Sequence, residues 1–251
     1  MDILRYSLEC SDRWRTPAVG YQVETEWKSG RSDECIWLEF MTCAFGRRKE
    51  AIMLINNSRS YLRDFEPADR TAFVAYQMDP RYRRLYDLDD DPTRANELFD
   101  LFASWRMENP RRNFQLGIFD TSTDRLCGCG GLRLRPEDHE TAVLGIELAP
   151  SDWGRYRIAL DAISYLLEYG FEILRLRMIV GDTASGNERV EKLARWFGAR
   201  IIDQRDGPQW MRARGWHEVD WALTQEEWHH SSHHRRRRAM SVLEIAGKHK
   251  P

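Results

Sequence analysis

The run Glu147-Leu-Ala-Pro-Ser-Asp-Trp-Gly-Arg-Tyr-Arg-Ile-Ala-Leu-Asp-Ala162 contains the pattern that decides the fold. Leu144, Ile146 and Leu148 lie two residues apart, which is the period of one face of a strand. Pro150 ends that strand, because it has no N–H to give to a ladder. Beyond the turn, the apolar positions change to a helical period: Ile158, Ala159, Ala162, Ile163, Leu166 and Gly170. The sequence therefore predicts a strand, a tight turn and a long amphipathic helix.

The turn itself reads Trp153-Gly-Arg-Tyr-Arg157. A helix that begins here directs free backbone N–H groups at one place, and Arg155 and Arg157 add two guanidinium groups. This combination favours a site for a phosphate or a pyrophosphate.

Composition sets limits on the function. At 251 residues the chain suits one medium domain with extensions. Its formal net charge of −2 gives no electrostatic basis for binding nucleic acid. No apolar run approaches the roughly 20 residues of a membrane span, and the first residues do not read as a signal peptide. The five cysteines are an odd number, which favours a reducing compartment, so we expect a cytoplasmic protein without membrane association.

The chain divides into three predicted segments. Residues 1–52 are either a true N-terminal extension or sequence upstream of a natural start at Met53. Residues 53–228 form the predicted domain. Residues 229–251 are rich in His and Arg; they could bind a metal or an acidic partner, but such runs cannot bury apolar area, and we predict a disordered tail.

Within the domain, the periodicities predict the order β-α-α-β-β-β-α-β-α-β-β, an α/β (α+β) fold with a mixed sheet and helices on both faces. The charged stretch from Arg81 to Asp91 is predicted to be a connector. The glycines after Leu126 indicate a bulge or a close backbone approach in the strand that carries Cys127 and Cys129. We predict that these two cysteines do not share a metal ion, and we predict no other metal site.

Residues 60 to about 228 resemble the GNAT superfamily of acyl-CoA-dependent N-acyltransferases, and most of all the branch of ribosomal-protein N-terminal acetyltransferases. The matching pieces are Tyr61-Leu-Arg-Asp-Phe-Glu-Pro-Ala-Asp69, Gly145-Ile-Glu-Leu-Ala-Pro-Ser-Asp-Trp-Gly-Arg155, Leu167-Glu-Tyr-Gly-Phe171, and Asn187 with Val190-Glu-Lys-Leu193 and Gly198. The resemblance implies a mostly antiparallel central sheet in which one pair of strands splays apart to hold the cofactor.

The resemblance also implies acetyl-CoA as co-substrate, with its pyrophosphate on the turn and its pantetheine arm in the splayed gap. Backbone groups of Glu147 and its successors would bind the arm. The cofactor-binding residues implied in this way are Leu148, Ala149, Trp153, Gly154, Arg155, Tyr156, Arg157, Ile158, Ala159 and Asn187.

Two departures from the family pattern concern the turn and the acid. The turn lacks one glycine and has one extra residue, since Tyr156-Arg157-Ile158 precedes Ala159. Either the loop bulges there or the pocket is altered, because Tyr156 does not allow a positive φ cheaply. The tyrosine that many relatives use as general acid is replaced by Ala194.

The implied chemistry is direct attack of an amine on a thioester in a ternary complex. Glu147 is the candidate base, directly or through a water molecule; alternatively it only orients the amine or structures the strand end. Trp210 is a candidate for the acceptor pocket, although a tryptophan of this kind is more often a core residue.

We therefore predict an N-acetyltransferase that acts on a primary amine, either a small molecule or a protein N-terminus, as a monomer or homodimer. The alternative is a non-catalytic acyl-CoA-binding module. A role in nucleic-acid binding through Arg235–Arg238 is less favoured.

Overall fold

The computed structural model describes residues 53–54, 59–86, 88–135 and 138–231. The N-terminal segment 1–52 and most of the predicted tail lie outside these ranges, so both of those predictions stay open. Among the described residues, no helix combines the length and the apolar character that a bilayer crossing requires.

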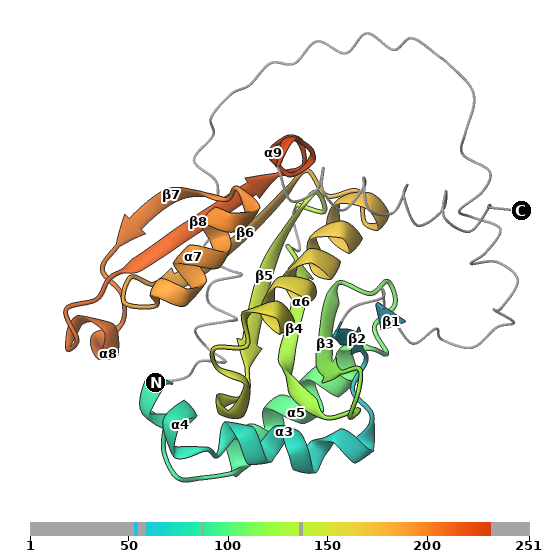
Figure 1. The fold of residues 1–251 in the computed structure, drawn as a ribbon, viewed down its shortest axis with the longest axis vertical. Helices are drawn as coiled ribbons and strands as arrows, with labels where there is room; N and C mark the ends of the chain where they lie inside the picture. Colours follow the sequence, from blue (N-terminus) through green and yellow to red (C-terminus); the bar gives the residue numbers. More distant parts are fainter. Residues whose placement is uncertain (1–52, 55–58, 87, 136–137, 232–251) are drawn as a thin grey trace, which may run out of the picture. The chain divides into compact units, whose positions relative to one another are not determined.

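One eight-stranded sheet forms the centre of the domain (Figure 1), with the strand order β1-β2-β3-β4-β5-β6-β8-β7. Neighbouring strands are antiparallel, except for the parallel pair β5 and β6. The strands are β1 (Met53–Leu54), β2 (Ser60–Arg63), β3 (Asn113–Asp120), β4 (Leu126–Leu134), β5 (Thr141–Leu148), β6 (Met178–Ala184), β7 (Arg200–Arg205) and β8 (Glu218–Thr224). The predicted mixed, mostly antiparallel sheet is confirmed.

Helices cover both faces of this sheet, as predicted. They are η1 (Pro67–Asp69), α3 (Arg70–Gln77), α4 (Pro80–Tyr86), α5 (Thr93–Trp105), η2 (Pro150–Asp152), α6 (Tyr156–Glu168), the π-helical η3 (Tyr169–Ile173), α7 (Glu188–Phe197), α8 (Gln209–Arg212) and α9 (Gln225–His230). Side chains of α6, α7 and α9 share one apolar core, and side chains of α3, α4 and α5 share another.

The predicted face of α6 is buried against the sheet. Ile158, Ala162 and Leu166 are at most 1% exposed, within the first core. Gly170 continues this face, and a Cβ atom there would lie 2.8 Å from Ile179 on β6. The long helix therefore packs closely on the strands, which fixes where its N-terminus lies.

One predicted connector is a helix. The charged stretch from Arg81 to Asp91 was expected to be irregular, but its first half belongs to α4. The reason is that Tyr82 is buried at 3% exposure in the core of α3 and α5, so one apolar contact orders a segment whose other residues are mostly charged. This correction matters for the site, because Tyr82 on α4 reaches Glu147 on β5.

The parallel pair β5 and β6 splays apart, as predicted. Its register joins only Thr141–Val143 to Met178–Val180. Beyond that point β5 continues alongside β4 as far as Leu148, while β6 continues alongside β8 as far as Ala184. The two strands thus diverge, and a gap opens inside the sheet.

A bulge interrupts β4 at Cys127, since Ile118 pairs with Gly128 and Phe119 pairs with Leu126. Cys127 consequently belongs to the core of α6, whereas Cys129 belongs to the core of α3 and α5. The two thiols lie on opposite faces of the sheet. Among the described residues, no group of metal-binding side chains is found.

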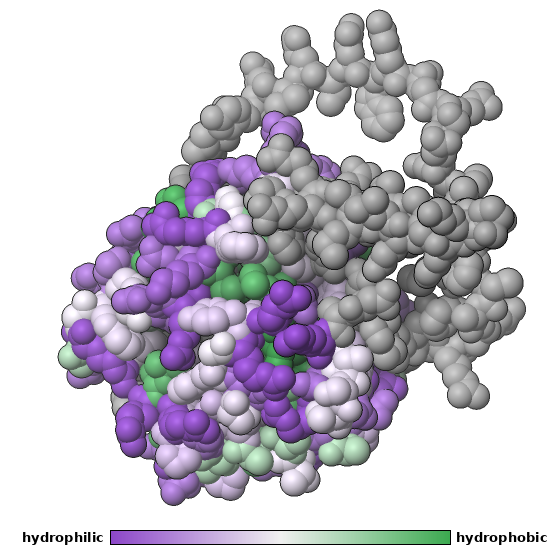
Figure 2. Space-filling model, viewed as in Figure 1, coloured by the Kyte–Doolittle hydropathy of each residue, from purple (hydrophilic) through white to green (hydrophobic). Residues whose placement is uncertain are grey.

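The surface of the described residues is mainly hydrophilic in the view of Figure 2, where apolar side chains appear as small separate areas. This agrees with the high content of charged residues, 31%.

Candidate functional site

The turn after β5 begins with η2 and leads directly into α6. Gly154 has a φ of 91°, Arg155 is the N-cap residue, and Tyr156 is the first residue of the helix. Among the described residues, only Asp124 and Arg175 are non-glycine residues with a positive φ. Tyr156 is therefore unstrained, and the glycine missing from the family pattern is not needed where the helix begins.

The N-terminus of α6 is suited to an anion. The backbone N–H groups of Tyr156 and Arg157 have no acceptor within the helix, because they belong to its first turn. Both residues are exposed, and the positive end of the helix dipole lies here. The Ile158 N–H already donates to the Arg155 carbonyl at 3.0 Å, and the side chains of Ile158 and Ala159 are buried. The residues present therefore fit a phosphate group.

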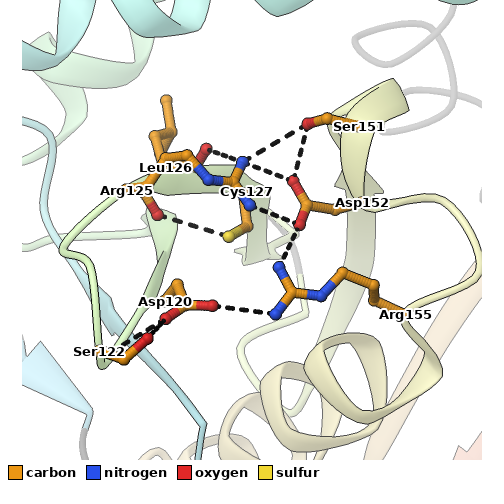
Figure 3. A network of polar contacts seen from close by, with 8 residues as sticks. All are labelled: Asp120, Ser122, Arg125, Leu126, Cys127, Ser151, Asp152 and Arg155. Atoms are coloured by element: carbon orange, nitrogen blue, oxygen red, sulfur yellow. Dashed lines mark hydrogen bonds and ion pairs between the residues drawn. The ribbon is translucent and has the colours of Figure 1, made fainter.

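The Arg155 side chain is held in an ion-pair network with Asp152 and Asp120 (Figure 3). One of its nitrogens donates to Asp152 at 2.7 Å, and the other donates to Asp120 at 3.0 Å. Arg125 also donates to both oxygens of Asp152, at 2.7 Å each. Asp152 is fully buried. The network thereby ties the turn to the hairpin between β3 and β4.

The network stabilises its carboxylates in the charged form. Hydrogen bonds from the hydroxyl and backbone N–H of Ser122, followed by the Arg155 guanidinium, lower the pKa of Asp120 to about 2. Burial raises the pKa of Asp152, but the hydrogen bonds from Arg125 and Arg155 outweigh it, and the net direction is downward. Of the two arginines predicted for the phosphate, Arg155 is committed to this network, whereas the Arg157 guanidinium has no hydrogen-bond or ion-pair partner among the described residues.

The gap between β5 and β6 exposes part of the β5 backbone. Ala149 donates its N–H to Cys127 on β4 at 2.7 Å. Because antiparallel pairs alternate, the backbone groups of Leu148 and Ile146 point away from β4 and toward the gap. The indole N–H of Trp153 reaches the Leu148 carbonyl at 2.9 Å. Leu148 thus offers its N–H to a ligand, whereas the Ala149 N–H is already paired.

The other side of the gap ends at α7. Asn187 is the N-cap residue of this helix, and its side-chain oxygen accepts the Val190 N–H at 3.4 Å. The guanidinium of Arg189 lies 5.9 Å from the ring centroid of Trp153. The start of α7, which Asn187 caps, therefore lies near the turn, and the role of Asn187 in cofactor binding stays a prediction.

Glu147 lies on the splayed part of β5 and is partly buried. Its Oε1 accepts the Tyr76 hydroxyl at 2.6 Å and the Gln77 amide at 2.7 Å, and the Cys129 thiol lies at 3.4 Å. Its Oε2 accepts the Tyr82 hydroxyl at 2.5 Å. We call these five side chains the Glu147 cluster. The candidate base is thus held by donors from α3 and α4.

The other titratable groups of the cluster stay protonated at neutral pH. Burial, followed by the charges of nearby acidic groups that include Glu147, raises the pKa of both Tyr76 and Tyr82 well above the usual value. Burial and the Glu147 charge likewise raise the pKa of Cys129. Burial raises the pKa of Cys127 to about 11. Neither thiol is therefore an activated nucleophile.

Trp210 on α8 is partly buried and packs edge-on against Trp216, with ring centroids 6.5 Å apart. The Arg214 guanidinium lies 5.3 Å from one of these rings and 5.5 Å from the other. Arg214 also donates to the Arg84 carbonyl on α4 at 2.9 Å. The segment with Trp210 is therefore attached to the same helix that carries Tyr82.

Sequence reasoning missed the donors around Glu147 and the partners of Arg155. Tyr76 and Gln77 lie about 70 positions before Glu147, and Tyr82 lies in the segment predicted to be a connector. The acidic Asp152, two residues after a proline, was the one local signal that Arg155 had a partner in its own turn.

Comparison with known proteins decides the family. The acetyltransferase (GNAT) domain family matches residues 59–200, which is more than half of the chain and includes β5, the turn and α7. The chain belongs to this family. The matched domain is that of an acyl-CoA-dependent N-acyltransferase, which transfers an acetyl group directly to an amine. The splayed sheet described above agrees with this assignment.

Individual relatives agree with this assignment. An uncharacterized N-acetyltransferase of Bacillus subtilis (strain 168), YoaA, is 28% identical over 142 residues, which cover 56% of this chain and 78% of that protein. An acetyltransferase (GNAT family) from Bacillus anthracis superposes with a TM-score of 0.57 at 16% identity, covering 70% of this chain and 99% of that one. These matches support the superfamily and do not single out the ribosomal-protein branch.

A second solved structure contains ligands. Spermidine N-acetyltransferase from Vibrio cholerae, in complex with CoA and spermine, superposes with a TM-score of 0.58 at 20% identity, covering 68% of this chain and 99% of that one. At this identity the likeness concerns the fold.

Proposed function

We propose that this GNAT enzyme uses acetyl-CoA as its acyl donor and a primary amine as its acceptor, with Glu147 at the point where the two meet. The position of Glu147 carries the proposal. It is a carboxylate on the splayed half of β5, one residue before the free N–H of Leu148. A base and an oxyanion donor are thus adjacent on one strand.

The proton balance explains why a carboxylate is useful there. An ammonium group loses one proton before it attacks the thioester carbonyl and a second when the tetrahedral adduct collapses to the amide. The departing thiolate takes up one of these protons, and the other goes to solvent. We assign the first deprotonation to Glu147, directly or through water. The Leu148 N–H is placed to donate to the developing oxyanion.

For the cofactor, we propose that the pyrophosphate binds the N–H groups of Tyr156 and Arg157 and the Arg157 guanidinium. The pantetheine arm would occupy the gap, where Leu148 and Asn187 offer backbone and side-chain groups. Arg155 supports the turn without touching the phosphate. Trp153, Gly154, Ile158 and Ala159 contribute shape and backbone.

For the acceptor, we propose an amine that is positively charged in solution, because it meets a carboxylate. The solved relative that binds spermine makes a small polyamine one candidate class, and a protein N-terminus is the other. Trp210 lies on the segment attached to α4, and we propose that it borders this acceptor site.

A non-catalytic acyl-CoA-binding module is the second candidate. The presence of Ala194 favours this alternative, because many relatives have a tyrosine there that serves as general acid. Without it, no residue of this chain is assigned to protonate the thiolate.

The test has two steps on the full chain. Calorimetric titration with acetyl-CoA comes first, and no binding at millimolar concentration would exclude both candidates. Thiol release is then measured across a panel of polyamines, amino acids and peptides. Turnover with any amine favours the enzyme, and binding without turnover favours the module. Glu147→Gln should lower turnover by roughly 10²-fold, and an unchanged rate removes Glu147 from the reaction.

A further inference from the structure

The proposed role of Glu147 rests on its carboxylate, and the cluster around it points to a second residue. We infer that Tyr82 is a positioning residue that acts through Glu147: its hydroxyl orients the carboxylate so that one acceptor position of Oε2 remains for the substrate amine. This inference depends on the proposed function, and the experiment below separates the two.

The hydrogen bonds of the cluster leave little freedom. A carboxylate offers about four acceptor positions, two on each oxygen. On Oε1, Tyr76 and Gln77 occupy both, at 2.6 and 2.7 Å, and the Cys129 thiol adds a longer contact at 3.4 Å. On Oε2, Tyr82 occupies one, and the described part of the chain supplies no second donor to this oxygen. The remaining position on Oε2 is thus the one at which an ammonium or a bridging water can bind.

The Tyr82 ring is held firmly enough to orient a partner. It is 3% exposed and packs against Tyr76, with ring centroids 5.9 Å apart, and against Tyr86, with centroids 4.8 Å apart. Its hydroxyl stays a donor at neutral pH, as described above. Because the ring is packed in place, its hydroxyl keeps one acceptor position of Oε2 closed to the substrate. The amine can then approach Oε2 only at the other position.

Tyr82 lies apart from the residues proposed to bind the cofactor, so its substitution can affect the acceptor side of the reaction without affecting CoA binding. Helix α4 reaches Glu147 through Tyr82, and its backbone accepts Arg214 from the segment that carries Trp210. The turn and its ion-pair network involve other residues, on the β3–β4 hairpin and at the start of α6. Loss of the Tyr82 hydroxyl should therefore change the chemical step and leave the binding of CoA intact.

Tyr82→Phe is the informative substitution, because it removes the hydroxyl and keeps the buried ring. Its matched control is Tyr61→Phe, which also removes a hydroxyl that donates to a carboxylate, Asp124, but on the β3–β4 hairpin. We expect Tyr82→Phe to lower kcat roughly tenfold, the size of a lost hydrogen bond to a charged group. The Kd of acetyl-CoA, measured by calorimetry, should change less than about twofold, and this binding also reports that the variant is folded.

A double-mutant cycle shows whether Tyr82 acts through Glu147. In the Glu147→Gln background, Tyr82→Phe should change kcat by less than about twofold. A tenfold loss in that background as well, or no loss in the native background, overturns the inference while leaving the proposed function in place. If Glu147→Gln alone keeps full turnover, the proposed role of Glu147 fails, and the inference fails with it.

Discussion

The Arg155 guanidinium donates to the Asp152 carboxylate at 2.7 Å, three residues earlier in the same turn. Asp152 is fully buried and receives Arg125 as well. Arg155, which the family pattern assigns to the phosphate, is therefore part of the ion-pair network that supports the turn, next to the proposed phosphate site. This difference between supporting and binding residues can be measured.

Substitution of the two arginines of the turn should have different consequences. Arg155→Met leaves the buried Asp152 with only Arg125 as its arginine partner, and it should lower the free energy of unfolding by about 1–2 kcal/mol. The loss is smaller than for a fully buried ion pair, because the Arg155 side chain is half-exposed. Arg157→Met should leave stability unchanged and raise the Kd of acetyl-CoA roughly tenfold. Urea unfolding and calorimetry distinguish the two. Loss of affinity without loss of stability in Arg155→Met would make Arg155 a phosphate ligand after all.

The glycines at the bulge and in the turn should also behave differently. A Cβ atom on Gly128 would lie 2.2 Å from the Glu147 carbonyl oxygen, and φ there is 151°. Gly128→Ala should therefore cost about 2–4 kcal/mol of stability and lower turnover, because β5 must shift. Gly154 also has a positive φ, but a Cβ atom there meets nothing within 4 Å. Gly154→Ala should cost only about 1 kcal/mol. Equal melting temperatures for the two variants would contradict this explanation.

Asp182 on β6 gives the domain a pH dependence. Burial, followed by the nearby carboxylates of Glu218 and Asp220, raises its pKa to about 6, although Arg133 and Arg205 oppose the shift. The folded state thus binds a proton more tightly than the unfolded chain does. The contribution of Asp182 to stability is greatest below about pH 4 and is lost as the pH rises through about 6.

The corresponding variant is Asp182→Asn, which should be more stable than the native protein at pH 7.5, by about 2–3 kcal/mol at most. At pH 4 the difference should disappear. Urea unfolding at the two pH values checks this, and a stability difference that is the same at both would show that Asp182 does not titrate as described.

The two roles of Asn187 can be separated with two substitutions. Asn187→Ala removes the N-cap of α7 and should lower stability by about 1 kcal/mol. Asn187→Ser keeps a capping oxygen and should retain most of that stability. If the amide also contacts the cofactor, both variants should bind acetyl-CoA more weakly. Native affinity in Asn187→Ser would limit Asn187 to capping.

Trp210 should affect the acceptor alone. Trp210→Leu is expected to raise the KM for the amine several-fold, because part of the proposed pocket wall is lost, with the Kd of acetyl-CoA unchanged. A matched change in the core of α3 and α5 is Trp105→Leu, which should alter stability and not KM, since Trp105 is a buried core residue of α5. A KM that is unchanged in Trp210→Leu would remove this residue from the acceptor site.

Local patterns were sufficient for most of the fold. The alternation before Pro150, the helical period from Ile158, and the positions of Asn187 and Gly198 predicted β5, α6 and both ends of α7. Each of these signals lies within the element it predicts. Gly198 ends α7 with a φ of 89°, the left-handed conformation that a helix C-cap glycine allows.

The side-chain networks could not be predicted in this way. Arg155 meets Asp120 across 35 positions because the β3–β4 hairpin lies beside the turn, and Glu147 meets Tyr82 because the folded chain brings this side chain of α4 to β5. Such partners depend on which segments become neighbours, and no period in the sequence records that. Helix α4 was missed for the same reason, since its burial depends on the aromatic core it joins.

The gap between β5 and β6 has a consequence for how this protein can change over evolution. The proposed donor site is formed by the main chain of Leu148 and by the first turn of α6. Such a site depends on the path of the backbone, so many side chains could be replaced without its loss. The solved relatives keep the fold at only 16 and 20% identity. The proposed acceptor site, by contrast, depends on individual side chains such as those around Glu147, so acceptor preference can diverge between proteins whose donor sites stay the same.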